Sequence, residues 1–461
     1  MQEPLKVSYS GVRGIYGRSL TAQVAARFGR AFAIFLQQRK SNPLIVMGKD
    51  TRPSGKELKA AVLSGLGAIK CRVADLRVVP SPTVQVMMDH LGADGGLIIT
   101  ASHNPPEWNG FKFLIGPHHI VLDREQTDEL FRLERQLEAA PFEAFPQPES
   151  FDARAEALQC HVQRVLAQVD VDVIGARRFR VCLDAGAGAG AEPGATLLER
   201  LGCDVTTLEV QRESEPTPAH LAGLCQAVKE HGCDLGMAQD MDADRVALVS
   251  EKGEAIGEDY TFALAVRHLL AKWRGDRRPV VFKSTATSRM VDDIVAQAGA
   301  ELVEKPVGEV NLSKAVIAAV AEGRNAVAGE GTGGVIHPRV CFGRDSLVGA
   351  ALVLEHLAQT GVPLSAAAAQ LPTYHILKEA IEGVDADAVP GLLAAVKRNY
   401  AGRDISEADG VKIRLADRSW ILVRPSNTEP LVRLVIEAPA RQRAEELMLE
   451  LRRVAAEALG S

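Results

Sequence analysis

Short apolar runs alternate with longer mixed segments along most of the chain. Three stretches repeat one order, which is an apolar strand, small or polar turn residues, a helix and a second strand. The two strands are predicted at residues 44–47 and 73–79, at 179–183 and 203–205, and at 280–283 and 301–303. Strands that alternate with helices indicate parallel βαβ units with right-handed crossovers. The pattern predicts three related α/β domains, although one large α/β domain would give a similar pattern.

The last part of the chain follows a different pattern. Strands are predicted at 411–415, 420–423 and 431–436 without intervening helices, and an amphipathic helix is predicted at 442–458. This order is typical of a small α+β module. We therefore predict α/β domains with mixed sheets, followed by a smaller C-terminal α+β domain, with bounds at 1–150, 151–256, 257–370 and 371–461.

Composition narrows the classes of protein that the pattern allows. The 461 residues are 46% hydrophobic and 24% charged, as in ordinary globular proteins. A net charge of −6 argues against a nucleic-acid binder, which normally carries a basic excess. No run of about 18 apolar residues and no secretory leader is visible, so we expect no membrane contact. Seven cysteines without a CxxC pair indicate reduced thiols in a cytoplasmic protein.

A serine follows the buried strand that is predicted at 95–100. Ser102 stands at the carboxyl end of that strand, where functional groups gather in α/β proteins. His103 beside it does not indicate a hydrolase, because adjacent residues in an extended segment point apart and the GxSxG elbow is absent. A serine in such a loop is commonly a turn former, so Ser102 taken alone indicates no chemistry.

Three aspartates at alternate positions lie between two apolar strands, predicted at 235–238 and 246–250. Asp240, Asp242 and Asp244 can converge on one hard cation, and without it they would repel one another. An EF-hand is excluded because Arg245 stands where that loop needs glycine, and because the flanks are strands. A solvated acidic turn is the alternative.

Two further loops carry groups that suit a sugar phosphate. Glu330, in a run of glycines, can accept hydrogen bonds from sugar hydroxyls, although a plain turn explains the run equally well. Arg424 begins the segment Arg-Pro-Ser-Asn-Thr, whose guanidinium, hydroxyls and backbone N–H groups suit a phosphate, although a capped turn beside a surface arginine is the alternative. The four motifs fall one per predicted domain. Together they indicate phosphoryl transfer on a sugar phosphate, in a cleft among four domains.

The residues 100–105, 240–245, 329–333 and 424–428 resemble, in order and spacing, the signatures of the α-D-phosphohexomutases. The resemblance spans essentially the full chain. It implies four domains around a central cleft and one Mg²⁺ per chain. It also implies an isomerase that interconverts hexose 6-phosphate and hexose 1-phosphate through a phosphoserine and a bisphosphate, with hexose 1,6-bisphosphate as activator. The expected partner is a hexose phosphate, and the expected state is a monomer or homodimer.

The resemblance assigns roles position by position. Ser102 becomes the phosphoserine, and Asp240, Asp242 and Asp244 become Mg²⁺ ligands together with the Ser102 phosphate. Lys112 matches a family lysine proposed for acid–base work, and His103 and Arg13 are expected beside it in the catalytic set. The expected substrate-binding residues are Arg245, Lys283, Glu330, Thr332, Arg424, Ser426, Asn427 and Thr428.

Two positions depart from some mannose- and glucose-acting members, which have histidines where this chain has Glu309 and Gly334. The glycine-rich loop and the 424–430 segment look nearest the archaeal-type phosphoglucosamine mutases. Glucosamine phosphate is therefore the first choice of substrate, because a carboxylate at 309 could pair with its amine. The alternatives are a bifunctional phosphomannomutase/phosphoglucomutase, a phosphatase that loses its phosphoserine to water, and a non-catalytic sugar-phosphate sensor.

Overall fold

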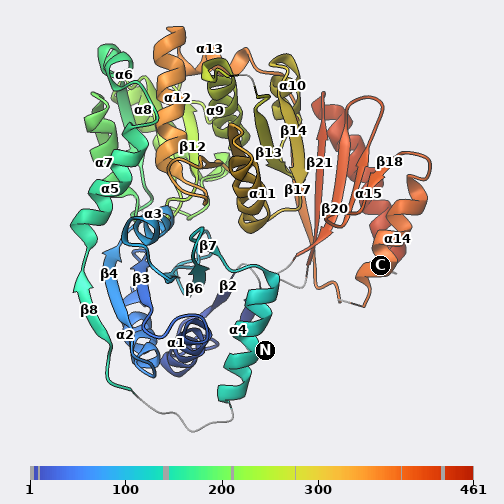
Figure 1. Ribbon diagram of the computed structural model, residues 1–461. Coiled ribbons are helices and arrows are strands. Elements are labelled where there is room, and N and C mark those ends of the chain that lie inside the picture. The colour runs from blue at the N-terminus through green and yellow to red at the C-terminus, as the bar shows by residue number, and fades with distance from the viewer. Residues whose placement is uncertain are drawn as a thin grey trace.

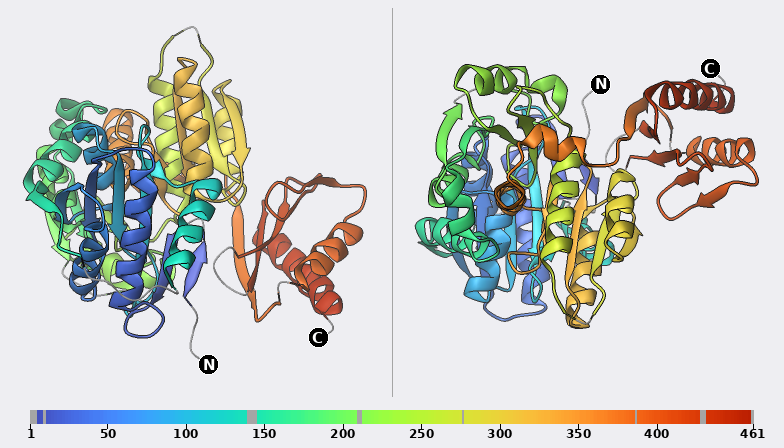
Figure 2. Two further views of the ribbon diagram at one scale, coloured as in Figure 1. Left: turned by 60° about the horizontal axis from the view of Figure 1, so that its bottom comes forward. Right: turned by 90° about the horizontal axis from the view of Figure 1, so that it is seen from above.

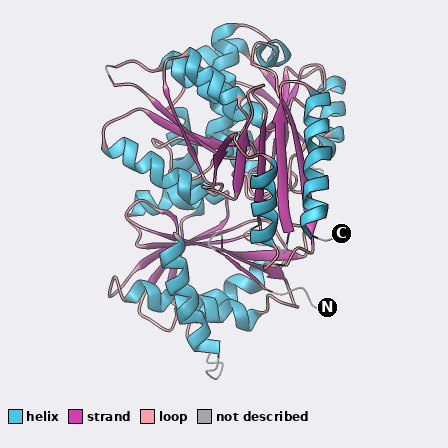
Figure 3. Ribbon diagram, turned by 90° about the vertical axis from the view of Figure 1, so that its right-hand side faces the viewer, coloured by secondary structure: helices cyan, strands magenta, loops and turns pink. Residues whose placement is uncertain are grey.

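The computed structural model describes residues 5–8, 11–138, 145–208, 212–275, 277–385, 387–426 and 431–459. Its strands form four separate sheets, and helices pack on them (Figures 1 and 3). Three of the sheets are mixed and belong to α/β domains, and the fourth is antiparallel. The predicted fold class is confirmed.

The first sheet contains eight strands. Their order is β1 (Lys6–Ser8), β2 (Gly11–Ile15), β6 (Trp108–Ile115), β5 (Gly95–Ile99), β3 (Leu44–Lys49), β4 (Arg72–Val78) and β8 (Glu149–Asp152), with β7 (Ile120–Val121) paired to β6. Strands β4, β3 and β5 run parallel, and β6 returns antiparallel beside β5. Every residue of β5 is buried, as its apolar sequence predicts.

The next two sheets repeat this central order. One runs β10 (Asp204–Leu208), β9 (Arg180–Asp184), β11 (Leu235–Gln239) and β12 (Val246–Ser250). The other runs β14 (Glu301–Lys305), β13 (Val280–Ser284), β15 (Ala326–Glu330) and β16 (Gly334–Ile336). In both sheets the first three strands are parallel and the fourth is antiparallel to the third. The repeat read from the hydrophobic pattern is thus a repeat of topology.

Helices link the strands and cover the sheets. The first domain contains α1 (Ala22–Gln37), α2 (Gly55–Leu66), α3 (Ser81–Leu91) and α4 (Arg124–Glu138). The second sheet is accompanied by α5 (Arg154–Leu166), α6 (Val171–Arg177), α7 (Ala191–Arg200), the short 3₁₀ turn Pro218–His220 and α8 (Ala222–Glu230). The third is accompanied by α9 (Asp259–Lys272), α10 (Met290–Gln297), α11 (Glu309–Ala321), α12 (Ser346–Thr360) and α13 (Leu364–Ala369).

Helix α12 joins the second and third domains. It lies between α6 and α9 in Figure 1, and twelve successive residues from Ser346 to Leu357 are buried. Its N-cap, Asp345, accepts a hydrogen bond from the Leu347 N–H and lies 3.0 Å from the His161 ring of α5. A helix that is apolar on every side is expected to be enclosed by protein. Here it fixes the two domains against each other.

The C-terminal domain lies to one side of the other three (Figure 2). Its sheet runs β17 (His375–Glu382), β21 (Leu431–Ala438), β20 (Trp420–Pro425), β19 (Val411–Arg414) and β18 (Asp404–Ser406), packed against α14 (Val389–Asn399) and α15 (Arg441–Leu459). The three predicted strands and the terminal helix are confirmed. Strand β17 was not predicted, because its apolar and charged residues do not alternate regularly and the strand is only partly buried at the sheet edge.

Within the described ranges, no helix is both long and apolar enough to cross a membrane. The seven cysteines are all free thiols.

Candidate active site

Three of the sequence motifs occupy the same place in the repeated topology. Ser102 lies between β5 and β6, the aspartates lie between β11 and β12, and the glycine-rich loop lies between β15 and β16. In each case the loop joins the third strand of the unit to the antiparallel fourth. Backbone contacts hold the last two loops together, because the Val246 N–H donates to the Gly333 carbonyl over 3.1 Å. Gly333 has a φ of 84°, and a Cβ there would lie 2.4 Å from the Val246 oxygen, so only glycine allows the approach.

The Ser102 loop is held rigidly by its backbone while its hydroxyl is left unpaired. Ser102 is 1% exposed and has a φ of 51°, a left-handed conformation that is uncommon outside glycine. Its N–H donates to the Thr100 hydroxyl, and its carbonyl accepts from Arg52 at 2.6 Å and from the Ser214 hydroxyl at 3.1 Å. Its own Oγ is buried without a hydrogen-bond partner. A buried unpaired hydroxyl on a strained residue is a candidate reactive group.

Arg52 anchors this loop from below. It is 2% exposed, pairs with Asp50 at 3.0 Å, and donates to the carbonyl oxygens of Ser102, Asn104 and Pro105. We expect Arg52→Ala to lower the free energy of unfolding by ~3–5 kcal/mol, because it leaves the buried Asp50 carboxylate without its cationic partner and removes a donor from each of three loop carbonyls. Urea unfolding measures this loss. Arg452→Ala, which removes an exposed ion pair on α15, is the control and should leave the midpoint unchanged. An equally small effect at Arg52 would show that it does not anchor the loop.

The three aspartates form the one cluster among the described residues whose carboxylates could hold a metal ion. Their candidate ligand oxygens lie within 4.8 Å of one another, and each residue is at most 1% exposed. One oxygen on each of Asp240, Asp242 and Asp244 is buried without a hydrogen-bond partner. Buried carboxylate oxygens without donors are the atoms that a hard divalent cation binds. The residues therefore fit Mg²⁺.

The remaining carboxylate oxygens have protein donors. Asp240 accepts from the N–H groups of Asp244 and Arg245. Asp242 accepts from the Ser81 hydroxyl at 2.6 Å. Burial, with Asp244 and Asp242 nearby, raises the pKa of Asp240 well above its ordinary value. Burial alone would also raise the pKa of Asp244, but nearby cations, Arg344 foremost, hold it below its ordinary value.

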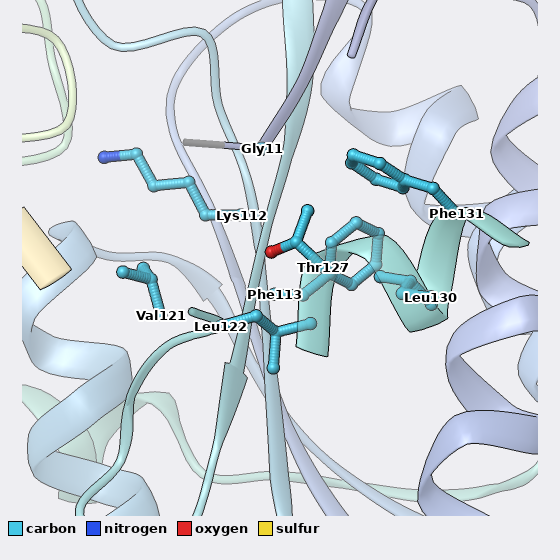
Figure 4. Close-up of a pocket in the computed structure, with 8 residues that line it drawn as sticks. All are labelled: Gly11, Lys112, Phe113, Val121, Leu122, Thr127, Leu130 and Phe131. Atoms are coloured by element: carbon cyan, nitrogen blue, oxygen red, sulfur yellow. The ribbon is translucent and has the colours of Figure 1, made fainter. Parts of the chain in front are cut away.

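Lys112 faces the aspartates because of its place in β6. Its neighbours Phe111 and Phe113 are buried in the apolar core of the first domain, so the alternation of a strand turns Lys112 to the opposite face. Figure 4 shows its side chain extending away from Phe131 of α4. Its ammonium lies 2.7 Å from Asp242 and 3.5 Å from Asp244. The acid–base role expected for Lys112 from the family resemblance stays a prediction.

His103 and two arginines lie beside the Ser102 loop. Arg245 Nη2 is 3.3 Å from His103 Nδ1, and Arg13 donates to the Asn104 side chain over 2.7 Å. Burial, and then the charges of Arg245, Arg13 and further arginines, lower the pKa of His103 well below its ordinary value. So much positive charge around a neutral imidazole indicates a place for an anion.

The glycine-rich loop contributes one carboxylate and one hydroxyl. Glu330 is 5% exposed and accepts from Arg344 Nη1 at 2.7 Å and from the Gly308 N–H at 3.3 Å. The Thr332 hydroxyl is buried without a hydrogen-bond partner, so it is available to bind a ligand. The Lys283 ammonium contacts Asp292 of α10 and the carbonyls of Thr287 and Ser288 just before that helix. Its expected role in substrate binding stays a prediction.

The fourth motif lies in the C-terminal domain. Arg424 is 7% exposed and donates from Nε to Asp409 at 3.1 Å. The other oxygen of Asp409 accepts from the Thr285 hydroxyl and the Val307 N–H, so this carboxylate joins the C-terminal domain to the third domain. The Ser426 N–H donates to the Leu431 carbonyl. The predicted residues Asn427 and Thr428 lie outside the described residues.

Sequence reasoning missed several residues that connect the loops. Ser214 donates to the Ser102 carbonyl and accepts from the Met241 N–H, and Glu215 pairs with Arg245 at 3.1 Å. Both stand in a polar segment after β10 that carries no recognisable motif. Arg344 was also missed, although it contacts both the aspartates and Glu330. The adjacent Asp345, a helix N-cap, was the available signal for a structured loop there.

Comparison with known proteins gives one family along the whole chain. Models of four domains described as phosphoglucomutase/phosphomannomutase match: alpha/beta/alpha domain I at 5–139, domain II at 159–253, domain III at 257–374 and the C-terminal domain at 377–454. A phosphoglucomutase/phosphomannomutase of Thermococcus kodakarensis is 36% identical, with 95% of each chain covered. A probable phosphoglucosamine mutase of Methanopyrus kandleri is also 36% identical with 95% of each chain covered. The crystal structure of a phosphoglucomutase/phosphomannomutase family protein from Burkholderia thailandensis superposes with a TM-score of 0.82 at 26% identity, covering 99% of this chain and 98% of that one.

Proposed function

Because the chain belongs to the phosphoglucomutase/phosphomannomutase family and is therefore a phosphohexomutase, we propose that it works through a phosphoryl group carried on Ser102, with glucosamine phosphate as its preferred substrate. The observation that carries the mechanism is the set of unpaired buried oxygens. Ser102 Oγ and one oxygen of each aspartate are buried without a hydrogen-bond partner. Arg245 Nε lies 3.8 Å from that oxygen of Asp240 and 3.5 Å from that of Asp244. Ser214 links their two loops, which supports a common ligand for these oxygens.

Asp240, Asp242 and Asp244 would hold Mg²⁺, with an oxygen of the Ser102 phosphate completing the set. When bound, Mg²⁺ supplies positive charge that stabilises the transferring phosphoryl group. The chain itself adds the Lys112 ammonium, paired with Asp242, and the Arg245 guanidinium beside His103. Cations fixed before the reaction avoid reorganisation when charge develops, which is the main requirement for breaking a phosphate ester.

The reaction consists of two phosphoryl transfers in opposite directions. The first breaks the bond between phosphorus and Ser102 Oγ and forms one to the free hydroxyl oxygen of the hexose phosphate. That hydroxyl loses one proton, and the released Ser102 Oγ takes one up. The resulting hexose bisphosphate turns in the site. The second transfer returns the other phosphate to Ser102, and a proton goes back to the sugar oxygen that is released. Phosphate is conserved, so a bisphosphate can also load an unphosphorylated enzyme and act as activator.

Two candidate sugars have support. Relatives named phosphoglucosamine mutase favour glucosamine phosphate, and Glu309 and Glu330 provide carboxylates near the glycine-rich loop. Dual phosphomannomutase/phosphoglucomutase activity is the second candidate. It is favoured by the name of the Thermococcus relative and by Arg344, which pairs with Glu309 and so occupies the carboxylate that was expected to meet the amine.

A panel of substrates tests this choice. We expect kcat/KM to be higher for glucosamine 6-phosphate than for glucose or mannose 6-phosphate. A preference of more than about tenfold, or ~1.4 kcal/mol, for either neutral sugar would reverse the ranking. Release of inorganic phosphate in place of the isomeric sugar phosphate would instead identify a phosphatase. Binding without turnover would identify a sensor.

Arg424 offers a prediction about binding alone. We expect Arg424→Ala to raise KM by roughly 10- to 150-fold, because a charge-assisted hydrogen bond to the substrate phosphate is worth ~1.5–3 kcal/mol. Ser102 should still accept phosphate from hexose 1,6-bisphosphate when the bisphosphate is in excess. Steady-state kinetics and phosphopeptide analysis of the same variant measure both effects. Unchanged KM with loss of Ser102 labelling would contradict this role.

A further inference from the structure

Arg344 lies beside the active site and has no task in the proposed mechanism. It stands in the loop between β16 and α12. Its Nη2 lies 2.7 Å from Asp244, its Nη1 lies 2.7 Å from Glu330, and its Nε lies 3.3 Å from Glu309. One guanidinium therefore touches a predicted metal ligand, the predicted sugar-binding carboxylate and the first residue of α11.

Gly334 makes room for this side chain. A Cβ at Gly334 would lie 2.5 Å from Cδ, 2.9 Å from Cγ and 3.1 Å from Cβ of Arg344. Real Cβ atoms do not approach another carbon at 2.5 Å, so any larger residue at this position would displace the Arg344 methylenes. The Arg344 side chain can therefore follow its observed path only because residue 334 is glycine.

Glu309 is held on both of its oxygens. Arg344 Nε lies 3.3 Å from Oε2, and the Gln85 side chain donates to Oε1 over 3.2 Å. The side chain of Glu309 is 14% exposed, and that of Arg344 is 12% exposed. Two carboxylates, Glu309 and Glu330, therefore share one guanidinium beside the glycine-rich loop. The charge felt by a sugar at this loop depends on both members of the Arg344–Glu309 pair.

We propose that the Arg344–Glu309 ion pair, admitted by Gly334, sets the charge beside the bound sugar and thereby determines the discrimination between an amino-sugar phosphate and its hydroxyl counterpart. This inference rests on the proposed function, in which the sugar binds near the carboxylates of Glu309 and Glu330. It adds a specificity-determining pair to that site. Removing the charge of Arg344 and removing the charge of Glu309 should change the preference for the amino-sugar phosphate in opposite directions.

The sign follows from charge. Without the Arg344 cation, Glu309 and Glu330 lose their ion-pair partner, and Glu309 keeps only the charge of Lys112 nearby. The two carboxylates then attract the ammonium of glucosamine phosphate more strongly than the hydroxyl of glucose phosphate. Without the Glu309 carboxylate, Arg344 gives the same place a more positive potential, which repels the ammonium. One unit charge several ångströms away in a partly buried site changes a binding constant on the order of tenfold. A purely structural role would instead affect both sugars alike.

The experiment compares kcat/KM for glucosamine 6-phosphate and glucose 6-phosphate in wild type, Arg344→Gln and Glu309→Gln. We expect the ratio of the amine to the hydroxyl substrate to rise about tenfold in Arg344→Gln and to fall about tenfold in Glu309→Gln. If a variant has no measurable turnover, the two dissociation constants measured by calorimetry give the same ratio. Ratios that stay constant, or that move in the same direction in both variants, overturn the inference.

Gly334→Ala is a second route to the same result without a change of charge. It should displace the guanidinium and change the ratio in the same direction as Arg344→Gln. An unchanged ratio would contradict the part assigned to Gly334.

Arg452→Gln and Glu379→Gln are the matched controls, because they alter an exposed ion pair between α15 and β17. Their ratios should equal that of wild type. Wild-type protein that converts neither sugar would contradict the proposed function itself. Conversion of both without opposite shifts would contradict the pair alone.

Discussion

Ser102→Ala is expected to lose mutase turnover by on the order of 10⁴-fold or more, because the phosphoryl carrier itself is removed. The stability of the fold should be unchanged, since the Ser102 hydroxyl has no hydrogen-bond partner and the loop is held by its backbone. Interconversion of the two sugar phosphates measures the loss, and the urea midpoint checks the fold. Ser150→Ala, at an exposed serine of β8, is the matched control and should retain full turnover.

Turnover in Ser102→Ala that stays within about tenfold of wild type would contradict phosphoryl transfer through Ser102. It would place the phosphoryl group on another residue or make the transfer direct. A variant that loses turnover and also unfolds at a lower urea concentration would instead assign Ser102 a structural part.

Asp240→Asn is expected to weaken Mg²⁺ binding by at least about 100-fold and to reduce turnover in parallel. The substitution keeps an oxygen that can accept from the Asp244 and Arg245 N–H groups, while the amide replaces the unpaired oxygen. Calorimetric titration measures the affinity directly. Mg²⁺ at about 100 times its dissociation constant should also stabilise wild type by ~2.7 kcal/mol, and the variant should gain little.

The control for this substitution is Asp404→Asn, which alters an exposed ion pair with Arg414 in the C-terminal domain. It should bind Mg²⁺ as wild type does. Equal Mg²⁺ affinity in Asp240→Asn and wild type would show that the cation lies elsewhere, and the metal assignment of the three aspartates would then be wrong.

The elements that flank the site could be predicted because they carry local signals. Buried strands such as β5 and β11 are apolar runs that end at polar or small residues, and hydrophobic burial determines where they lie. The three aspartates could be recognised because they stand at alternate positions within a single loop. Edge strand β17 gave no such signal, because its packing depends on β21, a strand about 50 residues further along the chain.

The connections between domains could not be predicted in the same way. Arg344 meets Asp244 from 100 residues away, and nothing near either residue marks the pair. Glu309 was expected to face a substrate amine, yet its oxygens already have Arg344 and Gln85 as partners. Such contacts depend on how separately folded sheets are placed against one another, and a local pattern holds no information about that placement. The structure was therefore needed to find the Arg344–Glu309 pair, to which we assign sugar selection.

The central claim is that Ser102 carries the phosphoryl group, and one measurement tests it directly. The enzyme is incubated with hexose 1,6-bisphosphate that bears labelled phosphate, in the presence of Mg²⁺, and the labelled peptide is identified by mass spectrometry. We predict one phosphate per chain on Ser102, its loss to added hexose 6-phosphate, and no label in Ser102→Ala. Label on a different residue, or label on Ser102 that the sugar phosphate never removes, would contradict the account.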